Sequence, residues 1–224
     1  SERALLNDMA FEWEDIGVQG DAGDDYNFFS AASGGTLTSV ADPGHASVSS
    51  YRDSTLGIYL LNNWPSDFSS SALAVTQLWG IRGGSGISIT HFDIFYNQDL
   101  YDFYTDPADA GLTANTYDMG TIALHELGHA LGLNHISTVP SNSAVMYPYL
   151  GISTVKRTVR DCDLKALSDN YNWSTDSALC PEAIEGDGSL ALNPTNAAIT
   201  EEQLDAAGIA MGDELGIVME LRTD

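Results

Sequence analysis

Apolar runs predict two strands and one helix in the first half of the chain. Residues 56–61 are almost continuously apolar, and the turn signals after them are typical of the end of a buried strand. Residues 86–97 alternate and are rich in β-branched and aromatic side chains, which predicts a second strand. A partial apolar face favours a helix over about residues 67–80, with Ser66 or Asp67 as its cap. The apolar residues of this face are Leu73, Val75, Leu78 and Trp79.

The second half of the sequence predicts two more helices, separated by loops. A helix is expected from about Asp118 to Leu131, because Asp118 is a favourable N-cap and its negative charge suits a helix start. Residues 161–171 fit another helix that is also opened by an aspartate. Residues 98–117 and 136–151 are expected to form loops.

The two ends of the chain carry weaker patterns. Residues 11–16 predict a short strand near the N-terminus. Residues 174–224 hold 11 acidic residues and one basic residue, a change in character that divides the chain into a main domain over residues 1–173 and an acidic extension. A capping box at residues 200–203 predicts a helix in this extension. Three glycines weaken that helix, so a strand over residues 217–221 is the alternative.

The strongest chemical signal is the stretch from residue 125 to residue 135, which reads His-Glu-Leu-Gly-His-Ala-Leu-Gly-Leu-Asn-His. His125 and His129 are four residues apart and therefore share one face of a helix. Gly132 lets the chain turn out of the helix, and His135 can then return to the same point. Three neutral imidazoles with a water form a catalytic zinc shell, beside which Glu126 can act as a base.

This spacing of histidines, glutamate and glycine resembles the zinc signature of the metzincin metalloproteases. That superfamily also carries a methionine turn, and residues 143–148 resemble one, with Met146 eleven residues after His135. The Met-Tyr-Pro form of the turn is similar to the matrixin branch. Residues 93–97 resemble the strand that precedes the active-site helix in bacterial matrixin-like sequences. Pro148 stands where astacin-like and serralysin-like enzymes place a tyrosine, so a zinc-binding tyrosine is not expected.

The resemblance to matrixins implies a fold and an activity. The implied fold is an α/β (α+β) catalytic domain with a twisted mixed sheet, a backing helix, an active-site helix and a C-terminal helix. The implied activity is that of a zinc-dependent endopeptidase acting on proteins or peptides. The resemblance then assigns His125, His129 and His135 as the zinc ligands and Glu126 as the general base. It assigns Met146 to the apolar floor of the site, and Tyr147 and Pro148 to the pocket for the side chain after the cut bond.

The resemblance also limits the number of metal ions. Animal matrixins bind a second, structural zinc through three more histidines and an aspartate, but only His45 and His91 remain in this sequence. One zinc ion per chain is therefore expected. Clustered carboxylates at residues 21–25 are a candidate Ca²⁺ site, although a solvated acidic turn is the favoured interpretation.

Charge and composition restrict the partners. The chain has 8 Lys and Arg against 32 Asp and Glu, so its formal net charge is −24, which repels nucleic acids and anionic membranes. No run is apolar and long enough to span a bilayer. We expect a monomer without nucleic-acid or membrane partners, whose acidic surface suits a secreted protein in a salty or extracellular medium. Four of the eight basic residues lie within residues 156–165 and are expected to pair with acids of the main domain.

The two cysteines, Cys162 and Cys180, allow one disulfide across a separation of 18 residues. Two free buried thiols are the alternative. Spacing alone does not decide between them, although a disulfide is favoured because Cys180 lies in a weakly patterned stretch.

Three alternatives to an active matrixin-like protease stay open. The first is a metzincin of another branch. The second is a binding or adhesion module that keeps the zinc scaffold without turnover, against which the intact Glu126 argues. The third is a self-inhibited protease in which residues 174–224 cover the cleft.

Overall fold

A computed structural model gives the fold of most of the main domain and of the C-terminal strand. The residues that it describes are 2–14, 38–40, 44, 47–52, 56–83, 86–110, 113–137, 139–170, 180, 208 and 210–223. The helices are α1 (Glu2–Glu14), α2 (Met119–Ala130) and α3 (Asp161–Asn170), with short 3₁₀ turns at Val48–Tyr51 and Pro107–Asp109. The strands are β1 (Thr38–Val40), β2 (Gly57–Leu61), β3 (Ala72–Gly83), β4 (Gly86–Asn97), β5 (Asp102–Tyr104), β6 (Thr116–Asp118), β7 (Tyr149–Leu150) and β8 (Glu214–Thr223).

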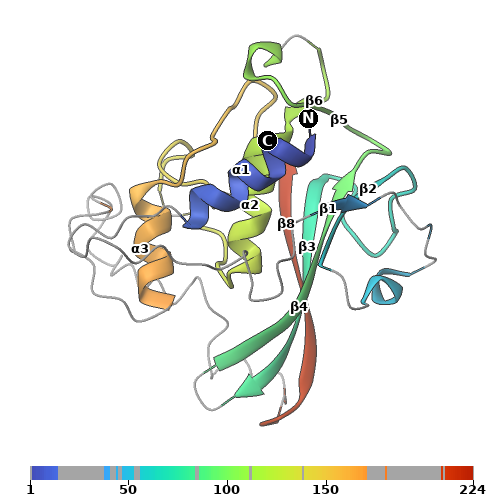
Figure 1. Cartoon of the computed structure of the whole chain (residues 1–224), viewed down its shortest axis with the longest axis vertical. Coiled ribbons are helices and arrows are strands. Elements are labelled where there is room, and N and C mark those ends of the chain that lie inside the picture. The colour runs from blue at the N-terminus through green and yellow to red at the C-terminus, as the bar shows by residue number, and fades with distance from the viewer. Residues whose placement is uncertain are drawn as a thin grey trace.

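Six of these strands form one twisted mixed sheet in the order β1-β2-β4-β3-β8-β7 (Figure 1). The pairs β1–β2, β2–β4 and β7–β8 are parallel, whereas β3 runs antiparallel to both of its neighbours, β4 and β8. β5 and β6 pair in a separate two-stranded sheet. The expected α/β architecture with a twisted mixed sheet is therefore confirmed.

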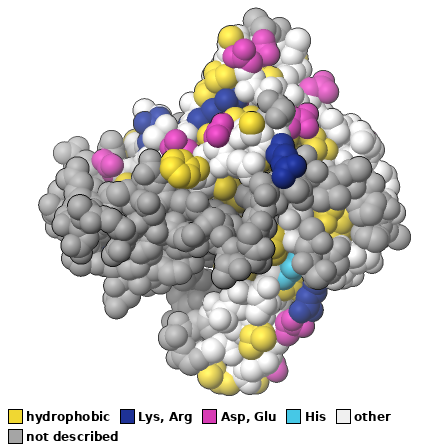
Figure 2. Space-filling model, viewed as in Figure 1, with side chains coloured by type: hydrophobic (Ala, Val, Ile, Leu, Met, Phe, Trp, Pro, Cys, Tyr) yellow, Lys and Arg dark blue, Asp and Glu magenta, His cyan; other side chains and the backbone are white. Residues whose placement is uncertain are grey.

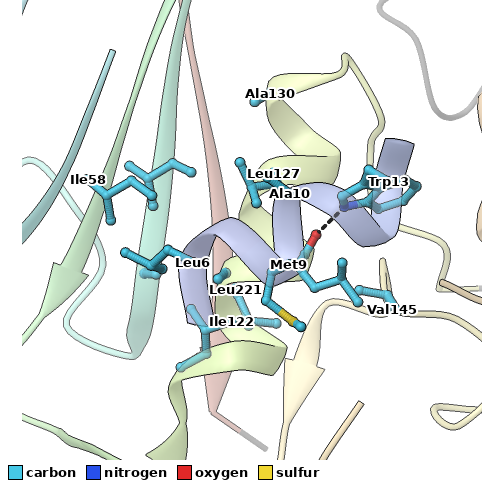
Figure 3. Packing of buried hydrophobic residues seen from close by; sticks show 14 of the residues in the cluster. Leu6, Met9, Ala10, Trp13, Ile58, Ile122, Leu127, Ala130, Val145 and Leu221 are labelled. Carbon is cyan, nitrogen blue, oxygen red and sulfur yellow. Dashed lines mark hydrogen bonds between the residues drawn. The ribbon is translucent and has the colours of Figure 1, made fainter. Parts of the chain in front are cut away.

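The helix α2 is the centre of the larger core. It packs against β3 and β8 and also against α1 (Figure 1). Buried side chains of α1 recur at helical spacing and include Leu6, Met9 and Trp13. The Trp13 indole N–H donates a hydrogen bond of 2.7 Å to the backbone carbonyl of Leu124 in α2 (Figure 3). This bond fixes a large buried aromatic ring against the helix that carries the candidate ligands.

The other face of the sheet is covered by an aromatic cluster. Its rings lie at centroid distances of 4.8 Å between Tyr51 and Tyr59, 4.9 Å between Tyr51 and Phe95, and 5.9 Å between Phe68 and Phe95. Val75 of β3 also belongs to this cluster. The middle of the sheet is thus buried on both faces, with α2 on one face and the aromatic cluster on the other.

The structure confirms most of the predicted strands and helices. The strands expected over residues 56–61 and 86–97 are β2 and β4. The helices expected from about Asp118 and over residues 161–171 are α2 and α3. Short strands β5, β6 and β7 lie within segments that were expected to be loops.

The helix predicted over residues 67–80 is wrong, because β3 begins at Ala72 and continues to Gly83. Along this strand Ala74 and Leu78 pack in the core around α2, whereas Val75 packs in the aromatic cluster. A strand buried on both faces is apolar at nearly every position, so a subset of its residues can mimic a helical face.

The strand predicted over residues 11–16 is also wrong, because α1 continues to Glu14. Trp13 is fully buried while Phe11 is 58% exposed, so the two aromatic residues lie on opposite faces of a helix. The apolar spacing that begins at Leu5 and Leu6, before the segment considered, carries the helical signal.

The C-terminal residues take the predicted alternative conformation. The strand expected over residues 217–221 lies within β8, whereas the capping box at residues 200–203 lies outside the described residues. β8 belongs to the sheet of the main domain, and the division of the chain at residue 173 stays a prediction. In the part of the chain that the structure describes, no helix combines the length and hydropathy that a bilayer crossing requires.

Candidate active site

The helix α2 is buried along its whole length, so its polar side chains point into the protein. Asp118 caps its first turn and accepts hydrogen bonds from the backbone N–H and the hydroxyl of Thr121, at 2.8 Å and 2.7 Å. Arg157 Nε donates to the same carboxylate at 2.9 Å. The expected N-cap is therefore present, and one of the clustered basic residues pairs with an acid of the domain.

The three histidines of the motif converge on one point. His125 and His129 lie one turn apart on α2, with ring centroids 4.6 Å apart. Gly132, at φ 83°, then turns the chain out of the helix in a conformation that suits glycine. His135 returns to the helix, with its ring centroid 5.2 Å from that of His125 and 4.9 Å from that of His129. One nitrogen from each ring lies within 4.8 Å of the other two.

Hydrogen bonds fix which nitrogen of each helical histidine faces the centre. Nδ1 of His125 lies 2.8 Å from the carbonyl oxygen of Val145, and Nδ1 of His129 lies 2.7 Å from that of Leu133. Because a carbonyl only accepts, both Nδ1 atoms carry the proton and both Nε2 atoms carry a lone pair. The Nε2 atoms of all three histidines are buried without a hydrogen-bond partner. Three such nitrogens around one point are the donor set that a hydrolytic zinc ion takes.

Burial keeps these imidazoles neutral. It lowers the pKa of His129 to about 3, assisted by the neighbouring His135. It lowers the pKa of His135 to about 4, assisted by the positive charge of Arg222. The pKa of His125 also falls well below its ordinary value, again first through burial. Neutral imidazoles are the form that binds a metal ion.

Glu126 lies next to His125 and is fully buried. The hydroxyl of Thr76, on β3, donates a hydrogen bond of 2.6 Å to Oε2 of Glu126 and lies 3.0 Å from its backbone carbonyl. Burial raises the pKa of the Glu126 carboxyl to about 8, against the opposing effect of the Thr76 hydrogen bond. A carboxyl with a pKa near neutrality is suited to accepting and returning a proton.

Met146 packs directly beneath α2. A Cβ atom added at Gly128 would collide with Met146 Sδ and would stand 2.8 Å from Cζ2 of Trp13, so the helix backbone is in close contact with both side chains. Gly128 lies between the two helical histidines in sequence. The absence of a side chain there allows the methionine to pack against the backbone of the helix that carries two of the histidines.

Asp163 ties this methionine segment to α3. Its carboxylate accepts hydrogen bonds from the backbone N–H groups of Val145 at 2.8 Å, Met146 at 3.0 Å and Arg160 at 3.0 Å. Burial raises the pKa of Asp163 to about 6, while these amide hydrogen bonds oppose the shift. Since the Val145 carbonyl lies against His125, Asp163 supports the cluster through one intervening residue.

The structure places the remaining candidate residues as follows. Tyr147 and Pro148 are half-buried and follow Met146, and Lys156 Nζ lies 5.5 Å from the centroid of the Tyr147 ring. Their role in a substrate pocket stays a prediction. His91 lies on β4, with Nε2 3.1 Å from Oδ2 of Asp93. His45 and the acidic turn at residues 21–25 lie outside the described residues.

A disulfide joins Cys162 to Cys180, with an S–S distance of 1.96 Å. It attaches Cys180 to α3 at the position directly before Asp163, which holds the methionine segment. Both cysteines are buried in a small cluster with Val139 and Ala144.

Sequence reasoning missed three residues that position the cluster: Trp13, Thr76 and Asp163. Trp13 and Thr76 lie on elements whose secondary structure was predicted wrongly, so their contacts with α2 could not be anticipated. The sequence did contain a feature that could have identified Asp163, which is the second aspartate in the first turn of a predicted helix. A first-turn aspartate usually serves its own helix, and nothing local indicates that it also bonds a distant turn.

Comparison with known proteins agrees with this geometry. Residues 21–172 match the family model of the matrixins. Among curated proteins, karilysin from Tannerella forsythia is 37% identical to this chain over 126 residues, which are 54% of this chain and 23% of karilysin. This chain therefore spans less than a quarter of the length of that relative. Because the family match covers most of the chain and includes the buried three-histidine cluster, this protein belongs to the matrixin family of zinc metalloproteases.

Proposed function

We propose that this protein is a zinc-dependent endopeptidase in which Glu126 is the general base and His125, His129 and His135 hold one catalytic zinc ion. One observation carries the proposal: three buried Nε2 atoms, two from α2 and one from His135 beyond its end, converge beside the buried carboxylate of Glu126 on α2. The substrates are proteins or peptides, as the family implies.

Each residue has a defined task in this mechanism. The zinc ion would supply Lewis acidity, which polarises the scissile carbonyl and acidifies the attacking water. Glu126 takes a proton from that water and later delivers it to the leaving amine. The Thr76 hydroxyl fixes the orientation of the Glu126 carboxylate through its hydrogen bond of 2.6 Å. Met146 supports the helix backbone from below, and Tyr147 and Pro148 line the pocket for the residue after the cut bond.

We further propose that the protein is secreted and works as a monomer. The disulfide supports an oxidising compartment, in which such bonds form and persist. The net charge of −24 supports a solvated coat, and Figure 2 shows Asp and Glu side chains distributed over the described part of one face. A Ca²⁺ site at residues 21–25 remains a proposal.

The test replaces Glu126 with glutamine, which keeps the shape of the side chain but removes the base. We expect Glu126→Gln to bind one zinc ion per chain and to lose at least about 100-fold in kcat/KM on a fluorogenic peptide, since general-base catalysis is worth that much. A matched control, Asp109→Asn, removes one negative charge from an exposed position on the 3₁₀ turn at Pro107–Asp109 and should leave activity unchanged. Zinc content measured by atomic emission and activity lost to a chelator complete the test. Unchanged hydrolysis by a zinc-loaded Glu126→Gln variant would refute the assignment.

A further inference from the structure

The C-terminal strand β8 occupies a position in the sheet that the matrixin match does not account for. The match ends at residue 172, whereas β8 spans Glu214–Thr223. β8 lies beside β3 and near α2 (Figure 1), and β7 pairs with its other edge. Without it, the edge of β3 beside α2 would lack a hydrogen-bonding neighbour within the described chain.

The main chain of β8 is bonded on both sides. Toward β3 the strands are antiparallel, with Leu221 opposite Ala74, and the N–H of Thr223 donates to the carbonyl of Ser71 at 3.1 Å. Toward the segment that follows the methionine turn the pairing is parallel, and the N–H of Arg222 donates to the carbonyl of Pro148 at 3.0 Å. Pairing of an extended peptide with an exposed strand edge is how proteins bind peptides by β-augmentation.

One side chain of β8 anchors the strand. Leu221 is 2% exposed and lies in the main core cluster with Ile122 of α2 and Met9 of α1 (Figure 3). By contrast, Val218 on the same strand is 47% exposed. A single fully buried leucine on a strand whose other residues are half-buried or exposed is typical of a peptide that inserts one residue into an apolar pocket.

The anchor lies directly beside the candidate catalytic groups. The backbone N–H of Leu221 contacts the carboxylate of Glu126, and the backbone of Glu220 contacts the ring of His135. The peptide bond between Glu220 and Leu221 therefore spans the distance from a zinc-ligand candidate to the proposed base. That is where the bond to be hydrolysed must lie if Glu126 is to reach both the water and the leaving nitrogen.

We infer that β8 lies in the peptide-binding site of its own protease, with the Glu220–Leu221 peptide bond in the place of the bond to be cut and Leu221 in the pocket that follows it. The strand thereby blocks access of other substrates in cis. This inference rests on the proposed endopeptidase function. A tethered strand has a high effective concentration, so it competes with any free peptide present at a lower concentration.

The first test measures competition. Deleting residues 214–224 should raise kcat/KM on a short fluorogenic peptide about ten-fold or more, through a lower apparent KM at constant kcat, because a competitor in cis is removed. Leu221→Ala in the full chain should act in the same direction, whereas Val218→Ala, on the exposed side of the strand, should not. Equal KM values for all four proteins would overturn the inference.

A second pair of variants keeps the test decisive if the deletion or Leu221→Ala fails to fold. Arg222→Pro removes the N–H that donates to Pro148 without altering a buried side chain, and Arg222→Ala removes the same charge but keeps that N–H. Because both variants lose the same charge, we expect the apparent KM of Arg222→Pro to lie below that of Arg222→Ala. Identical values for the two variants would count against the inference.

The third readout is binding, which does not depend on turnover. A fluorescein-labelled peptide with the sequence of residues 212–224 is titrated into zinc-loaded Glu126→Gln protein, with and without residues 214–224, and fluorescence anisotropy is recorded. The peptide should bind the shortened protein and not the full chain. If it binds neither protein, or both equally, β8 is only a structural strand.

The binding readout also separates failure of this inference from failure of the proposed function. If the shortened protein without the Glu126 substitution is folded and zinc-loaded but cleaves no peptide, the protease assignment fails. Anisotropy still reports whether the site accepts β8.

Discussion

Gly128→Ala tests the packing beneath the histidine cluster, because this glycine has no room for a side chain. The added Cβ would collide with Met146 Sδ and stand 2.8 Å from Trp13 Cζ2. The methionine can rotate away, but the Trp13 ring is fully buried and held by its hydrogen bond to Leu124. The clash with the tryptophan therefore has to move either α1 or α2.

Two opposing contributions set the expected size of the effect. Replacing glycine by alanine inside a helix favours folding by about 1 kcal/mol. Overpacking a well-filled core costs about 1–3 kcal/mol, and two simultaneous clashes, one with a fixed ring, put this site at the upper end. We expect a net loss of about 2 kcal/mol, which lowers Tm by about 4–8 °C for a chain of this size.

Thermal unfolding followed by circular dichroism, with zinc and with a chelator, measures this loss. A Trp13→Leu background provides the control, because it removes the ring that cannot move, so Gly128→Ala should cost less there than in wild type. Zinc affinity should fall about ten-fold in Gly128→Ala, since moving Met146 also moves the Val145 carbonyl that orients His125. A Tm equal to or above that of wild type would refute the proposed packing.

Two further predictions concern buried carboxyl groups. Asp163→Ala leaves the buried N–H groups of Val145 and Met146 without their acceptor, so it should reduce the free energy of unfolding by about 2–4 kcal/mol. Asp161→Ala, at an exposed position in the same helical turn, should change the urea midpoint little, and equal midpoints for the two variants would contradict the role of Asp163. The second prediction concerns Glu126 in metal-free protein, where burial raises the folded-state pKa of this carboxyl from about 4.5 to about 8. Protonation of Glu126 therefore stabilises the fold at low pH, and this stability is lost as the pH rises from about 4.5 to 8. Urea unfolding should therefore show wild type losing stability relative to Glu126→Gln across this interval, and a constant difference would exclude the shift.

The correct structural predictions concern side chains whose relative positions follow directly from their spacing in the sequence. His125 and His129 share a helical face because four residues make about one turn, and Gly132 ends the helix because its φ of 83° suits glycine. Asp118 caps α2 because a carboxylate satisfies the free N–H groups of a first turn. In each case the interacting groups are within a few residues of one another.

The wrong predictions came from segments whose burial depends on distant partners. β3 is apolar on both faces because α2 covers one and the aromatic cluster covers the other, and neither neighbour is visible in residues 67–80. The Thr76 hydroxyl bonds a carboxylate 50 positions away, and Trp13 bonds a carbonyl 111 positions away. Contacts at such separations follow from the topology of the sheet and cannot be read from local periodicity.

The sequence by itself determined the metal-binding chemistry, because the helix and the turn that this segment forms set the relative positions of the three histidines and the glutamate. The tertiary structure alone decided what surrounds that chemistry: the burial that keeps the histidines neutral, the Thr76 hydroxyl on Glu126, the Asp163 support of the methionine segment, and the position of β8 beside the proposed base. Burial and strand pairing depend on which surfaces meet when the whole chain folds, so no stretch of residues specifies them alone.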